Sequence, residues 1–205
     1  MEKERIKEKF KNHVATLTVL GNELPEGPVR ILDFQEPRHS NYYIRFLFDE
    51  RNYTLTISGD LGFLVARNAT NMTLKGFKDF LYNPSYFKEK VRCSERPLKE
   101  YDEDAAVEDL KKYFEEHELI DTIREEYGFE DDTDEDCIHE AIEDILRYSD
   151  REGIGTYGYD KLTELYPDAF EWEVGIRWSE ILDIYFVAYE MAMEQLEATG
   201  GDENE

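Results

Sequence analysis

The segment Asn41-Tyr-Tyr-Ile-Arg-Phe-Leu-Phe-Asp-Glu-Arg-Asn-Tyr-Thr-Leu-Thr-Ile-Ser58 decides the fold of the first half of this 205-residue chain. Apolar side chains recur at every second position in two runs, which is typical of strands with one buried face. The alternating residues are Tyr42, Ile44, Phe46 and Phe48, then Tyr53, Leu55 and Ile57. The intervening Asp49-Glu-Arg-Asn52 is the right length for a hairpin loop, so the segment predicts an antiparallel hairpin.

The sequence around this hairpin predicts a larger sheet with helices beside it. Residues 29–34 and 63–66 are two further candidate strands. All these runs lie too close together for helical crossovers, so an antiparallel meander is the economical topology. Residues 2–12 and 73–92 carry apolar residues at helical spacing. The first hundred residues are therefore expected to form a small antiparallel β-sheet with flanking helices.

The second half has a helical pattern throughout. Apolar stripes at helical spacing occur over residues 103–117, 119–128, 134–148 and 174–198. We interpret the segment 174–198, the longest of these, as the central helix of the second half. The prediction is an α+β protein with an N-terminal subdomain over 1–100, an acidic helical bundle over 101–199 and a disordered tail over 200–205.

Charge is distributed very unevenly along the chain. Residues 1–100 contain 17 Lys and Arg against 14 Asp and Glu, a net of +3, whereas residues 101–205 contain 7 against 35, a net of −28. An acidic tail that fails to fold is excluded, because 40% of the residues are apolar and the acidic stretches carry helical apolar stripes. Adaptation to high salt would enrich acids in both halves, so it does not explain a first half that is slightly basic. A face of this kind repels nucleic acid and anionic membranes, and it attracts basic surfaces.

Several function classes find no support in the sequence. There is no apolar window long enough to span a membrane and no apolar signal segment near Met1, which favours a cytoplasmic protein. Cys93 and Cys137 cannot form a disulfide framework. Neither a P-loop nor a dinucleotide-binding glycine pattern is present, and no activated nucleophile can be identified. We therefore expect no catalytic residue and no cofactor.

A calcium loop is the competing hypothesis for the acidic half. Asp132, Asp134, Asp136 and Glu143 fall at positions 1, 3, 5 and 12 of an EF-hand loop, where carboxylate oxygens would converge on a hard cation. However, Cys137 occupies the position at which the sharp turn needs glycine, and the helical apolar pattern continues through the segment. A metal-dependent activity that uses these four carboxylates stays open as an alternative.

Nucleic-acid mimicry is the hypothesis that best explains the acidic half. B-DNA carries about one negative charge per 1.7 Å of its axis, and a helix that advances about 1.5 Å per residue can display carboxylates at comparable density. The predicted partner is a basic nucleic-acid-binding protein, with no direct contact to nucleic acid or membrane. A scaffold whose acids only maintain solubility, or a homo-oligomer, is the simpler alternative. The candidate partner-binding residues are Glu125, Glu126, Glu130, Asp131, Asp132, Asp134, Glu135, Asp136, Glu140, Glu143 and Asp144.

Four short segments resemble accessory proteins carried by phages and mobile elements of Gram-positive bacteria. They are residues 41–46, the run Thr56-Ile-Ser-Gly-Asp-Leu-Gly62, residues 86–94 and residues 192–196. The resemblance spans most of the chain, and none of its motifs is catalytic. It implies an anti-defence protein, such as an anti-CRISPR inhibitor of Cas9 or of its guide-RNA complex, acting in the cytoplasm of a bacterial host.

Overall fold

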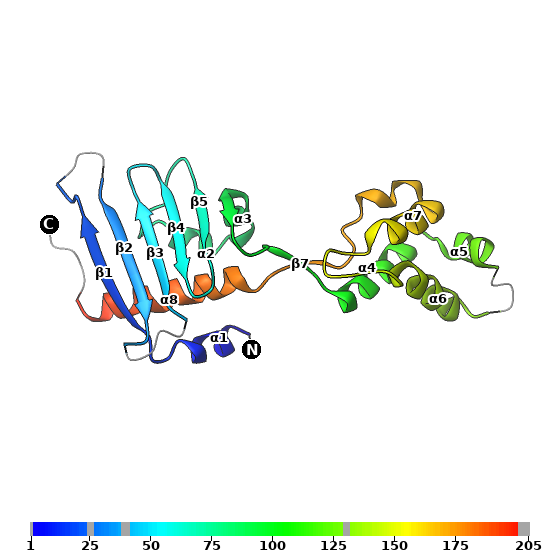
Figure 1. Ribbon diagram of the computed structural model, residues 1–205, viewed down its shortest axis with the longest axis horizontal. Coiled ribbons are helices and arrows are strands. Elements are labelled where there is room, and N and C mark those ends of the chain that lie inside the picture. Colours follow the sequence, from blue (N-terminus) through cyan, green and yellow to red (C-terminus); the bar gives the residue numbers. More distant parts are fainter. Residues whose placement is uncertain (1, 24–26, 38–41, 129–131, 201–205) are drawn as a thin grey trace. The chain divides into compact units, whose positions relative to one another are not determined.

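The computed structural model describes residues 2–23, 27–37, 42–128 and 132–200 (Figure 1). The chain forms two compact units. One, here called the sheet unit, consists of Met1–Leu98 together with Glu180–Glu205, and the other, the inserted unit, consists of Lys99–Ser179. The inserted unit therefore interrupts the sequence of the sheet unit, and each has its own hydrophobic core.

The sheet unit contains a six-stranded antiparallel sheet whose strands are neighbours in chain order (Figure 1). This meander confirms the predicted α+β class. Its strands are β1 (Val14–Leu20), β2 (Val29–Gln35), β3 (Ile44–Asp49), β4 (Thr54–Gly59), β5 (Leu64–Arg67) and β6 (Val91–Ser94). Its helices are α1 (Glu2–Lys9), α2 (Lys78–Leu81), α3 (Pro84–Lys90) and α8 (Ile181–Ala198).

The register of β3 and β4 shows why the sheet has one buried face. Phe46 pairs with Ile57 and Phe48 pairs with Leu55, and all four side chains are fully buried. The predicted hairpin is confirmed, although Tyr42 precedes β3 with a positive φ of 58°. Strands β1 and β6 have no counterpart among the predicted elements. The first alternates aliphatic residues with threonine, a weak polar contrast, and the second has only four residues.

Helix α8 corrects the predicted domain boundary. It lies across the buried face of the sheet (Figure 1), and it belongs to the sheet unit. The ring of Tyr189 contacts those of Phe46 and Phe48, and its hydroxyl donates a hydrogen bond to the carbonyl oxygen of Leu74. The interpretation of 174–198 as the centre of the acidic half is wrong, because an apolar stripe identifies a buried face but not the surface that covers it.

The inserted unit is mostly helical, as predicted for this part of the chain. Its elements are β7 (Lys99–Tyr101), α4 (Glu103–Glu116), α5 (Ile120–Tyr127), α6 (Asp134–Leu146), α7 (Gly155–Leu165), the 3-10 helix η1 (Pro167–Glu171) and β8 (Ile176–Trp178). Strands β7 and β8 pair antiparallel, with Lys99 opposite Trp178, so the chain enters and leaves this unit side by side. Within the described residues, no helix is long and apolar enough to cross a membrane.

The boundary between the two units changes which part of the chain carries the excess negative charge. The inserted unit contains 28 Asp and Glu against 8 Lys and Arg, a net of −20, whereas the sheet unit contains 21 against 16, a net of −5. The predicted division at residue 100 placed the acids of α8 and of residues 200–205 with the helical half. Of that predicted tail, 201–205 lie outside the described residues.

Candidate partner-binding surface

Capping side chains fix the starts of the two main acidic helices. At α4 the carboxylate of Asp102 accepts a hydrogen bond from the backbone N–H of Ala105 at 2.8 Å. At α6 the hydroxyl of Thr133 accepts from the N–H of Asp136 at 3.2 Å and donates to the Asp136 carboxylate at 2.6 Å. Thr133 is therefore the N-cap of α6, and the acidic first turns lie at the positive ends of both helix dipoles.

The apolar stripes of these helices determine which way the carboxylates point. Leu110 and Phe114 of α4, Ile123 of α5 and Ile145 of α6 are buried together in the core of the inserted unit. The remaining faces of the helices are left to solvent. Of the 28 carboxylates in this unit, 24 belong to exposed residues, two to half-buried ones, and Glu130 and Asp131 lie outside the described residues. The unit therefore displays its charge rather than burying it.

Eight of the eleven candidate residues lie on this exposed surface. Glu125 and Glu126 belong to α5, Asp132 precedes α6, and the other five are on α6. The five on α6 are Asp134, Glu135, Asp136, Glu140 and Glu143. Two further candidates, Glu130 and Asp131, fall outside the described residues, so their placement is left open.

Asp144 differs from the other described candidates in being half-buried. Its side chain is only 13% exposed and accepts hydrogen bonds from the hydroxyls of Tyr157 at 2.9 Å and Tyr127 at 3.4 Å, while Arg147 pairs with it at 2.9 Å. Burial and then the negative charge of Asp144 raise the pKa of Tyr127 well above its ordinary value, so that hydroxyl stays a donor. Asp144 joins α5, α6 and α7, and it is a poor candidate for contact with a partner.

A surface hollow brings part of the predicted set together with residues that the prediction omitted. It has a volume of about 780 Å³ and is bordered by α4 and α6. Asp134, Glu135 and Asp136 line it together with Glu115 and Glu118. The other lining residues are the apolar Phe114, Ile120 and Ile138 and the basic Lys111 and His139. The run of glutamates at the end of α4 could have indicated Glu115 and Glu118, but nothing in the sequence places that helix end beside the start of α6.

The EF-hand alternative does not fit this geometry. Helix α6 begins at Asp134, so supposed loop positions 3 to 12 are helical and cannot wrap around an ion. The carboxylates also have other partners: Asp134 binds Arg124 at 2.6 Å, and Glu143 binds the imidazole of His139 at 3.2 Å. Among the described residues, no three His, Cys, Asp or Glu side chains gather as a metal site.

Basic residues in the inserted unit neutralise only a few of its acids. Six of its eight Lys and Arg side chains pair with carboxylates of the same unit. The most enclosed pair joins Arg177 to both oxygens of Asp109, each at 2.8 Å, and the N–H of Gly175 donates to the same carboxylate. Burial alone would raise the pKa of Asp109, but these hydrogen bonds and the charge of Arg177 hold it below its ordinary value.

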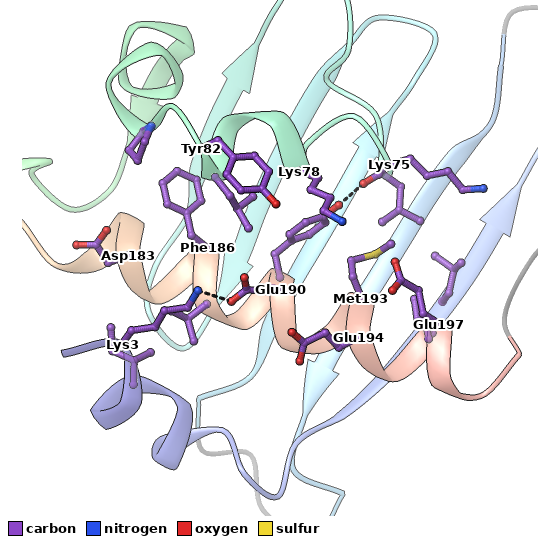
Figure 2. Close-up of a pocket in the computed structure, with 18 residues that line it drawn as sticks. Lys3, Lys75, Lys78, Tyr82, Asp183, Phe186, Glu190, Met193, Glu194 and Glu197 are labelled. Carbon is purple, nitrogen blue, oxygen red and sulfur yellow. Dashed lines mark hydrogen bonds and ion pairs between the residues drawn. The ribbon is translucent and has the colours of Figure 1, made fainter. Parts of the chain in front are cut away.

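The sheet unit has a groove of another character (Figure 2). It has a volume of about 840 Å³ and runs along α8, between α1 and the segment 74–84. Carboxylates of α8 line it together with lysines, and Lys3 pairs with Glu190 at 2.7 Å. Lys75 and Lys78 add positive charge on the opposite side, so the groove has mixed charge and does not resemble a run of phosphates.

Comparisons of the chain with protein-family models, with curated proteins and with solved structures find no significant match.

Proposed function

We propose that this protein inhibits a nucleic-acid-binding protein by presenting the inserted unit to the basic surface that normally holds DNA or RNA. The observation that carries the proposal is the concentration of charge on one unit. The inserted unit has its own core and a net charge of −20, and 24 of its 26 described carboxylates belong to exposed residues. Carboxylates on a packed helical frame would occupy the positions that phosphates take on that surface.

Helix geometry supports a match to the charge density of a nucleic acid. On α6, the exposed residues Asp136, Glu140 and Glu143 follow one another at intervals of four and three positions, so they share one face of the helix. At about 1.5 Å of rise per residue, successive carboxylates on that face lie about 4.5–6 Å apart along the axis. Neighbouring helices add further rows, which brings the surface closer to the density of a duplex.

Solubility alone explains the distribution less well. A solubilising surface needs a moderate net charge, and no requirement confines it to one unit. The adjoining sheet unit contains more residues yet has a net charge of only −5. Concentrated charge of one sign instead favours rapid, salt-sensitive association with a surface of the opposite sign.

The resemblance to phage accessory proteins narrows the proposed partner to a bacterial defence nuclease, with Cas9 as the first to examine. Cas9 holds its nucleic acids in a positively charged channel, which is the kind of surface that the inserted unit would occupy. The protein would then act inside the bacterial cell. Guide-free Cas9 and the guide-RNA complex expose different parts of that channel, so a comparison of the two would locate the site of binding.

The direct test neutralises exposed carboxylates for which the described part of the chain supplies no hydrogen bond or ion pair. The variant combines Glu125→Gln, Glu126→Gln, Glu135→Gln and Glu140→Gln on α5 and α6. A matched control makes the same change in charge on other elements of the unit. It combines Glu152→Gln, Asp160→Asn, Asp168→Asn and Glu171→Gln.

Dissociation constants for guide-free and guide-loaded Cas9, each measured at low and high salt, distinguish the outcomes. The α5–α6 variant should bind roughly 30-fold more weakly, because four exposed charge pairs at about 0.5 kcal/mol each sum to ~2 kcal/mol. The control should bind within a few-fold of the original. Binding that ignores both salt and the α5–α6 substitutions would rule out mimicry, and absence of binding to either form would rule out Cas9 as the partner.

A further inference from the structure

The two edges of the six-stranded sheet are built differently. Strand β6 is short, carries the exposed Arg92 and has an irregular register with β5 between Val65 and Ala66. Charge, brevity and irregularity are the features that keep an edge strand from pairing with another chain. Strand β1 has none of them: its seven residues, Val-Ala-Thr-Leu-Thr-Val-Leu, are uncharged, contain no proline and pair regularly with β2 along their whole length.

One side chain identifies which backbone groups of β1 point outward. The N–H of Ala15 donates to Gln195 Oε1 at 3.0 Å, and Gln195 Nε2 donates to the carbonyl oxygen of His13 at 2.8 Å. In an antiparallel strand, alternate residues direct both backbone groups to the same side. The outward positions of β1 after Ala15 are therefore Leu17 and Val19, and within the described chain no hydrogen bond engages their outward groups.

We propose that β1 pairs antiparallel with β1 of a second copy of this chain, around a two-fold axis at Thr18. In that register the outward N–H and C=O of Leu17 form hydrogen bonds with the outward C=O and N–H of Val19 in the second copy. By symmetry, Val19 of the first copy bonds Leu17 of the second. The two sheets become one continuous sheet. Both copies of α8 then lie on the same face, because the axis is perpendicular to the sheet.

The strand is self-complementary in this register. Leu17 and Val19 both face the α8 side of the sheet, so they form apolar cross-strand neighbours at the junction. On the other side, Thr18 meets its own copy, and Thr16 meets Leu20, which is 52% exposed in one chain. No charged side chain belongs to β1, so the paired strands themselves bring no like charges together.

Gln195 selects this register over its neighbour. An axis at Leu17 would pair Ala15 with Val19 and would displace Gln195 from the outward N–H of Ala15. With the axis at Thr18, the residue of the second copy that lies opposite Ala15 is Gly21. Gly21 follows the end of β1, and its φ of 70° turns the chain. The second copy therefore forms no strand pair at Ala15, and Gln195 can keep its hydrogen bond there. The side-chain amide therefore covers the part of the edge that the second copy does not need.

Disulfide trapping tests both the pairing and its register. Directly opposed residues at a non-hydrogen-bonded position have Cα atoms about 4.5 Å apart, within the range that a disulfide spans. In full-length protein carrying Cys93→Ser to remove the exposed native thiol, Thr18→Cys should form a covalent dimer on mild oxidation. Thr16→Cys is the matched control, because its two copies would lie roughly 14 Å apart in this register.

Light scattering of the unmodified chain gives an independent readout. The mass should rise with concentration from 24.3 kDa toward twice that value. Thr18→Lys and Thr18→Glu should each remain monomeric with unchanged circular dichroism, and an equimolar mixture of the two should recover the dimer. A chain that stays monomeric at high micromolar concentration in moderate salt, or a Thr16→Cys variant that crosslinks better than Thr18→Cys, would overturn the proposal.

Discussion

The sheet unit and the inserted unit each fold around a core of their own, but they build it from different residues. The sheet unit buries large aromatic side chains, among them Phe46, Phe77 and Tyr189, between its sheet and α8. The inserted unit packs mainly aliphatic residues such as Leu110 and Ile145, with Trp172 stacked on Tyr113 at a ring separation of 4.5 Å. Both units therefore have a core adequate for a fold, and neither core requires a surplus of surface charge.

The use of charge separates the two units most clearly. In the sheet unit, carboxylates are held by bases of the same unit, as in the pairs Arg45–Asp33 at 2.7 Å and Arg30–Glu50 at 3.2 Å. In the inserted unit the acids outnumber the bases by 20. This surplus opposes folding through self-repulsion. Because the surplus of negative charge disfavours folding and is confined to one unit, we connect it with binding to a partner.

The largest expected effect comes from ending the chain after Ser179. The sheet unit should unfold, because it loses the helix that covers its buried face, including Phe186 and Tyr189. The inserted unit should stay folded, since it retains β8 and its whole core. Amide hydrogen exchange measured by mass spectrometry would report both units in one sample. Protection that is lost from residues 103–165 as well would contradict the division into units.

A smaller effect is expected from breaking the ion pair inside the inserted unit. Asp109→Asn should lower the free energy of unfolding of that unit by about 1–2 kcal/mol at neutral pH, because Arg177 and the Gly175 N–H lose a charged acceptor. The control is Lys161→Gln, which removes a solvent-facing ion pair with Glu164. It should change the free energy of unfolding by less than about 0.5 kcal/mol.

The pH dependence of the same variant follows from the lowered pKa of Asp109. A carboxyl whose pKa is lower in the folded state stabilises the fold above its unfolded pKa, and that contribution disappears as the pH falls through the folded value. The difference between the original chain and Asp109→Asn should therefore be constant near neutrality and shrink below about pH 4. A difference that grows on acidification would show that Asp109 is not held as an anion.

The smallest expected effect is on the response to salt. Raising the ionic strength screens repulsion among exposed carboxylates, so the inserted unit should gain about 1 kcal/mol, equivalent to roughly 4–8 °C in its melting temperature. The sheet unit, with its small net charge, should change little. Hydrogen exchange at low and moderate salt would resolve the two responses. Equal gains in both units would mean that the charge surplus does not strain the inserted unit.

Local sequence patterns predict individual helices and strands better than they predict which elements pack against one another. The hairpin at 44–59 could be predicted because Phe46, Phe48, Leu55 and Ile57 alternate with polar residues strongly enough to fix a buried face. The apolar stripe of α8 is equally visible, but stripes do not specify what covers them. The helix joins a sheet whose last strand ends 87 residues before the helix begins, and no local signal spans that separation.

The candidate surface was predictable to a similar extent. Most of the acidic residues had to be exposed, because carboxylates are rarely buried without a partner. Asp144 is the exception because two tyrosines, 17 residues before it and 13 after it, converge on it in the folded unit. The hollow beside Asp134 likewise depends on the end of α4 reaching the start of α6, a contact between segments that the sequence leaves unspecified.

The central claim is that the inserted unit alone carries the partner-binding surface. The most direct test uses a chain in which residues 99–179 are replaced by a short glycine-serine linker. The measurement is the affinity of this chain for guide-free Cas9. In the full chain the pairing of Lys99 with Trp178 brings residues 98 and 180 close together, so a short linker can join them. The account predicts that this chain stays folded and loses binding, while the full chain binds in a salt-sensitive manner. A folded sheet unit that binds as tightly as the full chain would contradict it.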